Sequence, residues 1–389
     1  MRIVVNTIST KKHSGGAYQI AYNFLMETLH HQGEELEWYY ITSSDVDELV
    51  GKEFRALKGN RYFVFPTQPD FKGSYKSVKK DLKAWEDVYK PDVIYTISSP
   101  CYFTFRTPEI LRFANAWVTN PNKEAWKSMP WKAWLRMKIY RLNQIRMLHK
   151  AEYIITQSET VGRGLRRITG LPEENISVVP NVLPKVFAAV QVSKNIDDRW
   201  IDINSAAAPV PHKNLNIIPK VLVVLKEEYG VENVRFHLTI PEGHEMLKSI
   251  NNECAQYGIS DRIINHGRCT QQQLIEVYNR CCMCFLPTLL ETFSASSLEA
   301  MYFGQYIVAT DYEFNREVIE DAGVYYKPTD AKDAAQKINA ILSDKEMRLK
   351  MEERMKDRLS HYNDYDKHFN SILDFLVKVA VKTKTNKIP

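Results

Sequence analysis

The stretch CMCFLPTLLETFSASSLEAMYFG, residues 282–304, decides the fold prediction. It opens with the apolar run 282–286, which predicts a fully buried strand of a parallel sheet. A proline follows and ends this strand. Ser296 or Ser297 is a suitable N-cap for a helix that Gly304 closes. A strand, a loop and a helix in this order form the repeating unit of an α/β fold.

Two carboxylates, Glu291 and Glu299, flank the loop and the helix, with seven residues between them. In an open α/β sheet, ligands bind outside the carboxyl ends of the strands, where a helix N-terminus attracts phosphate. A carboxylate can accept hydrogen bonds from two adjacent hydroxyls, so the pair indicates a nucleotide-sugar pocket. The spacing alone is equally compatible with a surface helix residue at 299 and a loop charge at 291.

Residues 291–308 read E-T-F-S-A-S-S-L-E-A-M-Y-F-G-Q-Y-I-V. This run resembles the signature E-G-F-G-x-x-x-x-E-A-M-A-x-G-x-P-V-V of retaining glycosyltransferases of family 4 (group 1), which have the GT-B fold and include bacterial polysaccharide and lipopolysaccharide biosynthesis enzymes. Threonine and serine replace the two glycines of the loop. The resemblance implies a catalytic role for Glu291 and donor binding by Glu291, Thr292, Phe293, Ser294 and Glu299.

A chain of 389 residues predicts two domains. Strand-like and helix-like segments alternate along it, which favours doubly wound parallel sheets. The weakly periodic segment 183–198 is the expected linker. With the resemblance, we expect an α/β fold of two Rossmann-like domains that face each other across a cleft. Residues 1–182 would bind the acceptor, with helix 364–380 crossing back to them, and residues 183–363 would bind the donor.

Gly15 and Gly16 follow a short N-terminal strand and open a predicted helix. Glycine lets backbone N–H groups approach an anion closely, so the pair can cradle a phosphate. The fingerprint G-x-G-x-x-G is absent, and a simple turn is the alternative. The position resembles the N-terminal glycine loop of the family, which implies that both glycines contact the donor.

Lys213 stands between a strand predicted at 200–204 and a helix predicted from 214 to about 229. At that place it can pair with phosphate as a point charge, although a solvated loop lysine is the alternative. It resembles the family's catalytic and donor-binding lysine, but alanines replace the usual partner arginine. Further along, Glu317 resembles the glutamate of the family's P-E-V-I segment and is a weaker donor-binding candidate, with helix capping as its alternative.

We expect no cofactor and no metal, since we identify no Asp-x-Asp triplet suited to a divalent ion anywhere in the chain. Backbone amides, a helix N-terminus and a lysine can stabilise a leaving UDP or GDP without one. In family members that retain anomeric configuration, the leaving phosphate helps to deprotonate the acceptor. His13 and His212 are candidate bases that we do not assign.

The net charge of +5 is local, because residues 122–150 carry +7 and the rest of the chain about −2. This distribution argues against a nucleic-acid partner. The tryptophans and cations of this segment predict a helix at 131–150 that could rest on an anionic membrane surface. A surface helix with snorkelling cations is the alternative.

Six cysteines without a metal-ligand pattern, and no apolar run of membrane-spanning length, predict a reduced cytoplasmic protein, peripheral at most on the inner membrane face. The sequence thus predicts a glycosyltransferase that moves a sugar from a nucleotide-diphosphate sugar to a glycan or lipid-linked acceptor, in surface polysaccharide biosynthesis. The alternative is a catalytically weakened nucleotide-binding partner subunit of another transferase, which the missing arginine and altered glycines favour.

Overall fold

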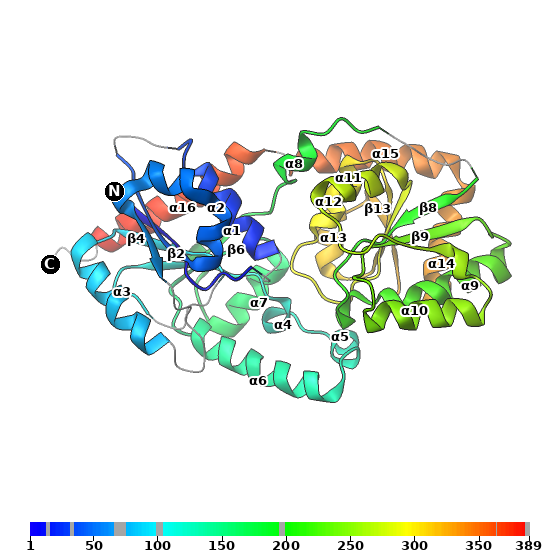
Figure 1. Ribbon diagram of the computed structural model, residues 1–389, viewed down its shortest axis with the longest axis horizontal. Helices are drawn as coiled ribbons and strands as arrows, with labels where there is room; N and C mark the ends of the chain where they lie inside the picture. The colour runs from blue at the N-terminus through cyan, green and yellow to red at the C-terminus, as the bar shows by residue number, and fades with distance from the viewer. Residues whose placement is uncertain are drawn as a thin grey trace. The chain divides into compact units, whose positions relative to one another are not determined.

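The computed structural model describes residues 1–12, 16–31, 35–65, 75–98, 104–193, 199–362 and 364–385. The chain forms two compact units, and each contains a parallel sheet with helices packed on it (Figure 1). Unit 1 comprises Met1–Thr119, Lys138–Val179 and Tyr365–Pro389. Unit 2 comprises Asn120–Met137 and Pro180–Asp364.

Unit 1 contains a seven-stranded sheet in the order β3-β2-β1-β4-β5-β6-β7, and every neighbouring pair is parallel. The strand order reverses between β1 and β4, which makes their carboxyl ends the topological switch point of this sheet. The strands are β1 (Arg2–Thr7), β2 (Glu37–Ser43), β3 (Tyr62–Phe65), β4 (Val93–Thr96), β5 (Glu109–Arg112), β6 (Tyr153–Thr156) and β7 (Ile176–Val178).

Parallel pairing requires crossover connections, and the helices of unit 1, except the last, lie between its strands in the chain. They are α1 (Gly16–Glu27), α2 (Ser44–Lys58), α3 (Tyr75–Tyr89), α4 (Ala116–Thr119), α7 (Glu159–Thr169), α16 (Tyr365–Thr385) and the C-terminal part of α6 (Trp131–Leu148). The last helix, α16, buries an apolar face in this unit, where Phe369 stacks on Phe24 at a ring distance of 5.2 Å.

Unit 2 contains a six-stranded parallel sheet in the order β10-β9-β8-β11-β12-β13. Its strands are β8 (Ile201–Asn204), β9 (Val234–Leu238), β10 (Ile263–Asn265), β11 (Met283–Leu286), β12 (Tyr306–Thr310) and β13 (Gly323–Tyr326). Its helices are α5 (Lys123–Lys127), α8 (Lys185–Ala188), α9 (Ile218–Tyr229), α10 (Glu245–Gln256), α11 (Gln271–Arg280), α12 (Ala295–Tyr302), α13 (Glu313–Ile319), α14 (Ala331–Ser343) and α15 (Lys345–Ser360). The reversal between β8 and β11 puts its switch point at the loops that carry Lys213 and Glu291.

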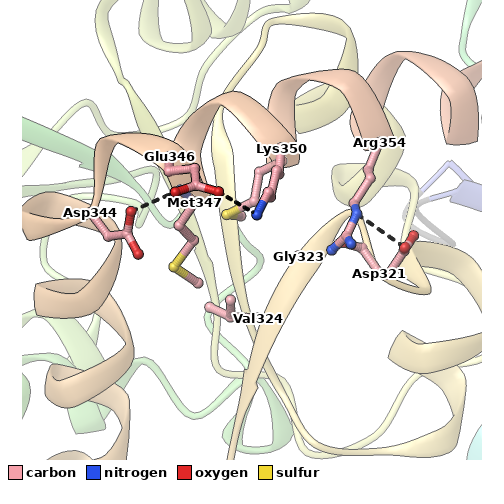
Figure 2. Close-up of a pocket in the computed structure, with 9 residues that line it drawn as sticks. Asp321, Gly323, Val324, Asp344, Glu346, Met347, Lys350 and Arg354 are labelled. Atoms are coloured by element: carbon pink, nitrogen blue, oxygen red, sulfur yellow. Dashed lines mark hydrogen bonds and ion pairs between the residues drawn. The ribbon is translucent and has the colours of Figure 1, made fainter.

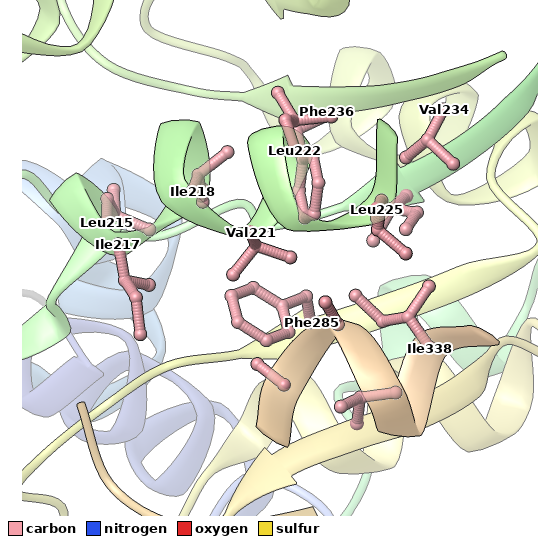
Figure 3. Packing of buried hydrophobic residues seen from close by; sticks show 14 of the residues in the cluster. Leu215, Ile217, Ile218, Val221, Leu222, Leu225, Val234, Phe236, Phe285 and Ile338 are labelled. Atoms are coloured by element: carbon pink, nitrogen blue, oxygen red, sulfur yellow. The ribbon is translucent and has the colours of Figure 1, made fainter. Parts of the chain in front are cut away.

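The main core of unit 2 lies between its sheet and helices α9 and α14 (Figure 3). Val221 and Leu225 of α9 point toward Phe285 of β11 and Ile338 of α14, and all four are fully buried. Each such side chain contributes about 1.5–3 kcal/mol when it leaves water. This packing fixes β8 and β11 in the centre of the sheet, and therefore fixes where their following loops begin.

A second cluster lies on the helices that follow β10 and β11. Phe187 of α8 makes edge-to-face contacts with Tyr278 of α11 at 5.8 Å and Phe303 at 6.2 Å. The expected linker 183–198 therefore contains a short helix that packs into unit 2, which its weak periodicity did not reveal. Residues 194–198 of that linker lie outside the described residues.

Three local expectations need correction. The N-cap of α12 is Ser294, not Ser296 or Ser297, because Ser294 has an extended backbone and its carbonyl accepts from the Ser297 amide at 3.2 Å. The helix expected from residue 214 begins at Ile218, since Asn214 takes a left-handed conformation with φ of 53°. The N-terminal half is also not one continuous domain, because residues 120–137 pack with unit 2.

Candidate active site

The candidate site is built from the loops that follow β8 and β11 in unit 2. Hydrogen bonds tie these loops to the sheet edge and to each other. The buried Ser205 hydroxyl donates to the Phe285 carbonyl at 3.0 Å, and the Leu289 amide donates to the His212 carbonyl at 2.7 Å. The Thr310 hydroxyl at the end of β12 donates to the Thr288 carbonyl at 2.6 Å. The two loops therefore hold each other in a defined position.

Lys213 and Glu291 meet at this position. Lys213 Nζ lies 2.5 Å from Glu291 Oε2, and the two side chains keep 20% and 25% of their surface exposed. The other carboxylate oxygen, Glu291 Oε1, accepts from the Thr292 amide at 3.1 Å. The structure thus brings together the two residues that the sequence marked as catalytic. It places Lys213 at the end of a 3-10 turn, Pro211–Lys213, and not directly at a helix start.

His212 lies next to this ion pair. Burial, together with the charge of Lys213, lowers the pKa of its imidazole to about 4. The ring is therefore neutral at pH 7 and is a weak proton acceptor at that pH. The other candidate base, His13, lies outside the described residues.

Glu299 is more enclosed than the sequence suggested. It is 9% exposed, and the Tyr278 hydroxyl donates a short hydrogen bond to its Oε2. Burial raises the pKa of this carboxyl, and the hydrogen bond from Tyr278 opposes that shift. The side-chain amide of Gln305 donates to the backbone carbonyl of Tyr278 at 2.9 Å. Glu299 is therefore a buried helix residue and not the surface residue of the alternative interpretation. Its contact with a ribose stays a prediction.

The remaining candidates take different positions. Phe293 is 6% exposed and packs against Tyr362 at 5.7 Å, so its side chain is a core group and its backbone is what a donor could contact. Thr292 is buried, and Ser294 is half-buried at the helix cap. Glu317 lies half-buried on α13, and its carbonyl accepts from Arg358 at 2.6 Å.

The N-terminal glycines are only partly described. Gly16 is the exposed first residue of α1 in unit 1, and Gly15 lies outside the described residues. Their expected contact with the donor therefore stays a prediction.

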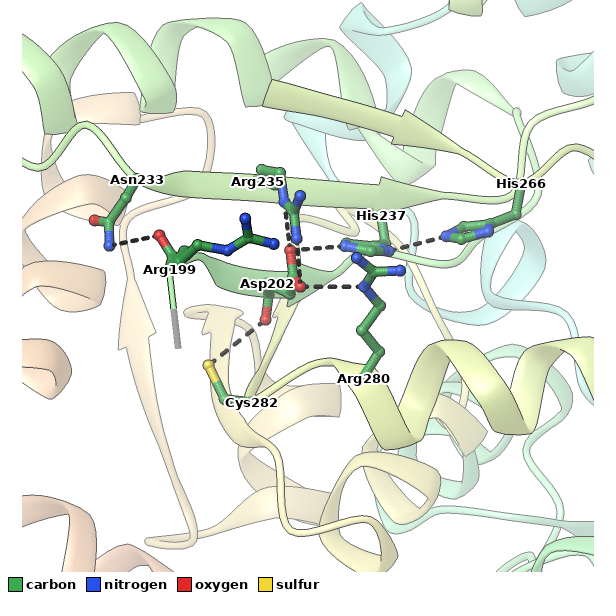
Figure 4. A network of polar contacts seen from close by, with 8 residues as sticks. All are labelled: Arg199, Asp202, Asn233, Arg235, His237, His266, Arg280 and Cys282. Carbon is green, nitrogen blue, oxygen red and sulfur yellow. Dashed lines mark hydrogen bonds and ion pairs between the residues drawn. The ribbon is translucent and has the colours of Figure 1, made fainter. Parts of the chain in front are cut away.

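Sequence reasoning missed a buried polar network on the same sheet (Figure 4). Asp202 accepts two hydrogen bonds of 2.8 Å from Arg235 and one of 3.3 Å from Arg280, and His237 Nε2 lies 2.9 Å from its Oδ1. Burial alone would raise the pKa of Asp202, but His237 and Arg235 outweigh burial and hold it well below its usual range. The signal was available, since Arg235 and His237 alternate with apolar residues on β9 and so share one face.

The network continues to a second histidine. His237 Nδ1 lies 2.9 Å from His266 Nε2, and the two rings stack at 5.1 Å. Every charge in this group has a partner of opposite sign or a hydrogen bond, which is the arrangement that a buried ion pair needs. We assign it a structural role in joining β8, β9 and α11.

A separate pocket of about 320 Å³ lies between β13 and α15 (Figure 2). It is bordered by ion pairs between Asp321 and Arg354 at 3.1 Å and between Glu346 and Lys350 at 2.6 Å. Gly323 and Val324, at the amino end of β13, form its floor. The Lys213–Glu291 pair lies beyond the carboxyl ends of the strands, whereas this pocket lies at the amino end of β13. The pocket is therefore not part of the candidate site.

The described clusters of acidic and histidine side chains that could ligate a metal belong to elements other than the Lys213–Glu291 loops. Among the described residues, Glu27, His31 and Asp366 of unit 1 bring ligand atoms within 4.8 Å of one another. Two Asp-x-Asp triplets do occur, at residues 45–47 and 364–366. The first has its carboxylates engaged by the Lys12 amide and by Arg55 in unit 1, and the second straddles the boundary between the units. None of these groups includes a residue of the loops that hold Lys213 and Glu291.

The cysteines fit the expectation of unpaired thiols. Cys254, Cys281 and Cys284 are buried, Cys269 and Cys282 are half-buried, and none of these five described cysteines forms a disulfide. Cys101 lies outside the described residues. Among the helices of the described segments, none has both the length and the hydropathy needed to cross a bilayer.

Solved structures with the same two-sheet architecture define the class of this fold. A glycosyltransferase from Rickettsia africae matches with a TM-score of 0.69, at 14% identity, over 97% of this chain and 98% of its own. The Anabaena protein HepE in complex with UDP and glucose gives 0.67, at 16% identity, over 97% of this chain and 100% of its own. The chain has the GT-B fold, and the predicted fold class is confirmed.

Residues 190–358 match the family described as glycosyl transferases group 1. This segment, which carries Lys213, Glu291 and Glu299, belongs to that family. The resemblance to group-1 glycosyltransferases that the sequence predicted is therefore confirmed.

Curated relatives are named as sugar transferases. The Campylobacter jejuni N,N'-diacetylbacillosaminyl-diphospho-undecaprenol alpha-1,3-N-acetylgalactosaminyltransferase is 28% identical over 220 residues, 52% of this chain and 54% of its own length. The Salmonella typhimurium O-antigen chain mannosyltransferase RfbU is 20% identical over 229 residues, 59% of each chain. The chain thus spans less than two thirds of the length of these relatives.

Proposed function

We propose that the protein transfers a sugar from a nucleotide-diphosphate sugar to a glycan or lipid-linked acceptor in surface polysaccharide biosynthesis. The observation that carries this proposal is the Lys213–Glu291 pair at the switch point of the unit 2 sheet. Ligands of open α/β sheets bind at such points. The pair offers a cation for the diphosphate and a carboxylate for sugar hydroxyls within one site.

In this proposal Lys213 stabilises the negative charge that develops on the departing diphosphate. The first turn of α12 adds backbone N–H groups of the kind that bind phosphate. A fixed cation and amides of this kind stabilise a leaving group without a metal ion, so we propose a metal-independent reaction. Glu291 would leave Lys213 when the donor binds and accept hydrogen bonds from the sugar.

We propose that the reaction retains the anomeric configuration. In that mechanism the departing phosphate takes the acceptor proton. The low pKa of His212 supports this assignment, because its imidazole is a poor general base at neutral pH. The donor would be linked to UDP or GDP, in keeping with the UDP complex of HepE, and the diphospho-undecaprenol in the name of the Campylobacter relative supports a lipid-linked acceptor.

Helix α6 supports a peripheral position on the inner face of a membrane. Trp131 is 70% exposed, Ile139 is 62% exposed and Leu142 is 60% exposed, and with Leu135 they form one stripe along the helix. Lys132 and Arg136 are exposed beside this stripe. Apolar side chains flanked by cations suit the boundary between acyl chains and anionic headgroups.

A nucleotide panel tests the transferase proposal. Thermal shifts would be measured with UDP, GDP, ADP and CMP and with their sugar conjugates, and nucleotide release would then be followed for each conjugate that binds. We expect stabilisation by one base and release that persists after exhaustive EDTA treatment. Binding without release would favour the alternative of a weakened partner subunit. Activity that is lost with EDTA and restored by Mg²⁺ or Mn²⁺ would contradict metal independence.

A further inference from the structure

We propose that Asn122 is a positioning residue for Glu291, acting through the carbonyl of Leu289. The proposal rests on the proposed transferase function and adds a residue from the distant segment 120–137 to its machinery. This segment belongs to unit 2 although it ends at Met137 and the rest of that unit begins only at Pro180.

Asn122 uses both ends of its amide. Its Nδ2 donates to the Leu289 carbonyl at 2.5 Å, and its Oδ1 accepts from the Ala125 amide at 2.8 Å. The second bond makes Asn122 the N-cap of helix α5. The side chain therefore links the start of α5 directly to the loop after β11.

The Leu289 peptide is held from both sides. Its carbonyl receives Asn122, and its own amide donates to the His212 carbonyl at 2.7 Å. Leu289 itself is 1% exposed, so neither backbone group can readily exchange its partner for water. Two residues after Leu289, the carboxylate of Glu291 reaches Lys213, which directly follows His212. One hydrogen-bonded path thus connects Asn122 to the ion pair.

Helix α5 makes a second contact with the same sheet edge. The Tyr312 hydroxyl donates to Glu124 Oε2 at 3.3 Å, and Tyr312 is the N-cap residue of α13 after β12. Helix α5 therefore holds the loops after two neighbouring strands. Loss of the Asn122 contact would let the backbone around Leu289 relax, and small displacements of groups that bind substrate are costly to turnover.

The variant Asn122→Asp separates the two functions of the side chain. Aspartate is as good an N-cap as asparagine, so α5 should form. Its carboxylate cannot donate to the Leu289 carbonyl and would repel it. Asn122→Ser, which keeps a capping oxygen without a charge, is the second variant. Lys123→Ala, at the exposed next residue of α5, is the matched control.

Two measurements follow on the full chain. Hydrogen–deuterium exchange should rise in the peptides that cover residues 285–294 for both Asn122 variants, and stay at the wild-type level for Lys123→Ala. With the donor identified by the nucleotide panel, kcat should fall about tenfold, as the loss of one buried hydrogen bond implies. The donor KM should change by less than about twofold, because a slightly displaced Glu291 would still contact the donor sugar but would stabilise the transition state less.

Unchanged exchange in both Asn122 variants would overturn the proposal. So would faster exchange with wild-type kcat, because the contact would then hold the loop without any effect on the reaction. If the wild-type protein releases no nucleotide from any donor, the transferase proposal fails separately. The exchange measurement would still decide whether Asn122 holds the Leu289–Glu291 loop.

Discussion

Lys213 Nζ lies 2.5 Å from Glu291 Oε2, although 78 residues separate the two in the chain. The two side chains are 20% and 25% exposed, so an incoming ligand can reach both partners. A diphosphate that carries more negative charge than one carboxylate can therefore displace Glu291. The pair is thus a neutral resting arrangement that a donor can open.

The first prediction concerns the cation. Lys213→Ala should lower kcat about 100-fold, the usual effect of removing one group that stabilises developing charge, and should weaken donor binding less. Lys220→Ala, an exposed lysine of α9, is the matched control and should behave as wild type. Steady-state nucleotide release gives both constants. Wild-type turnover in the Lys213 variant would mean that this residue is only a loop lysine.

The second prediction concerns the buried carboxyl. If Glu299 binds the ribose diol, Glu299→Gln should weaken nucleotide binding by about 1–3 kcal/mol while the protein stays folded. Tyr278→Phe removes the hydrogen bond to Oε2 without touching the carboxyl, and should weaken binding less. Isothermal titration with the nucleotide from the panel measures both. Equal affinity in wild type and Glu299→Gln would leave Glu299 a purely structural residue.

Much of the fold follows from local sequence signals. Buried strands such as 283–286 and 306–310 are apolar on both faces. This pattern is typical of parallel sheets, because helices cover both of their faces. The strand predicted at 200–204 agrees with β8 to within a residue, and the helix predicted at 131–150 agrees with α6 to within two residues. Strands β5 and β13 were missed because neither is a continuous apolar run: β5 has a charged residue at each end, and β13 begins with glycine.

The sequence could predict only those site residues that belong to a recognisable local motif. Lys213 and Glu291 were found because each stands in a recognisable loop, yet their ion pair depends on which strands are neighbours. Asn122 gave no signal, since its function depends on a contact with Leu289, 167 residues away. The burial of Glu299 was also missed, because helix periodicity does not show that Tyr278 points toward it.

The third prediction concerns acid stability. The pKa of His212 is about 4 in the folded protein and about 6.5 when the chain is unfolded. As pH falls below 6.5, the unfolded state binds a proton that the folded state does not, so folding stability is lost. This loss levels off below pH 4, where the folded imidazole is also protonated, and should reach about 3 kcal/mol, since each pKa unit corresponds to about 1.4 kcal/mol.

His212→Gln isolates this contribution from the other titrating groups, including His266, whose pKa burial also lowers. Urea unfolding at pH 7 and pH 4.5 gives the difference between the variant and the wild type. The variant should lose less stability between the two pH values. An identical loss in both proteins would show that His212 is accessible to protons in the folded state.

The last prediction concerns α6. Each exposed cation near an anionic surface contributes about 1 kcal/mol, and the attraction falls with salt. Wild-type protein should therefore co-sediment with anionic vesicles at low salt and show little binding to neutral ones. Changing Lys132 and Arg136 of α6, and the exposed Lys150 two residues after its end, to Glu should abolish binding. The same change at Lys79, Lys80 and Lys83, which are exposed on α3 of unit 1, is the matched control and should leave binding largely intact.

Turnover on a short soluble acceptor should survive both triple changes, because Lys213 and Glu291 belong to other elements. Equal co-sedimentation of wild type and the triple variant at 132, 136 and 150 would mean that these cations belong to a hydrated helix face that does not bind membranes.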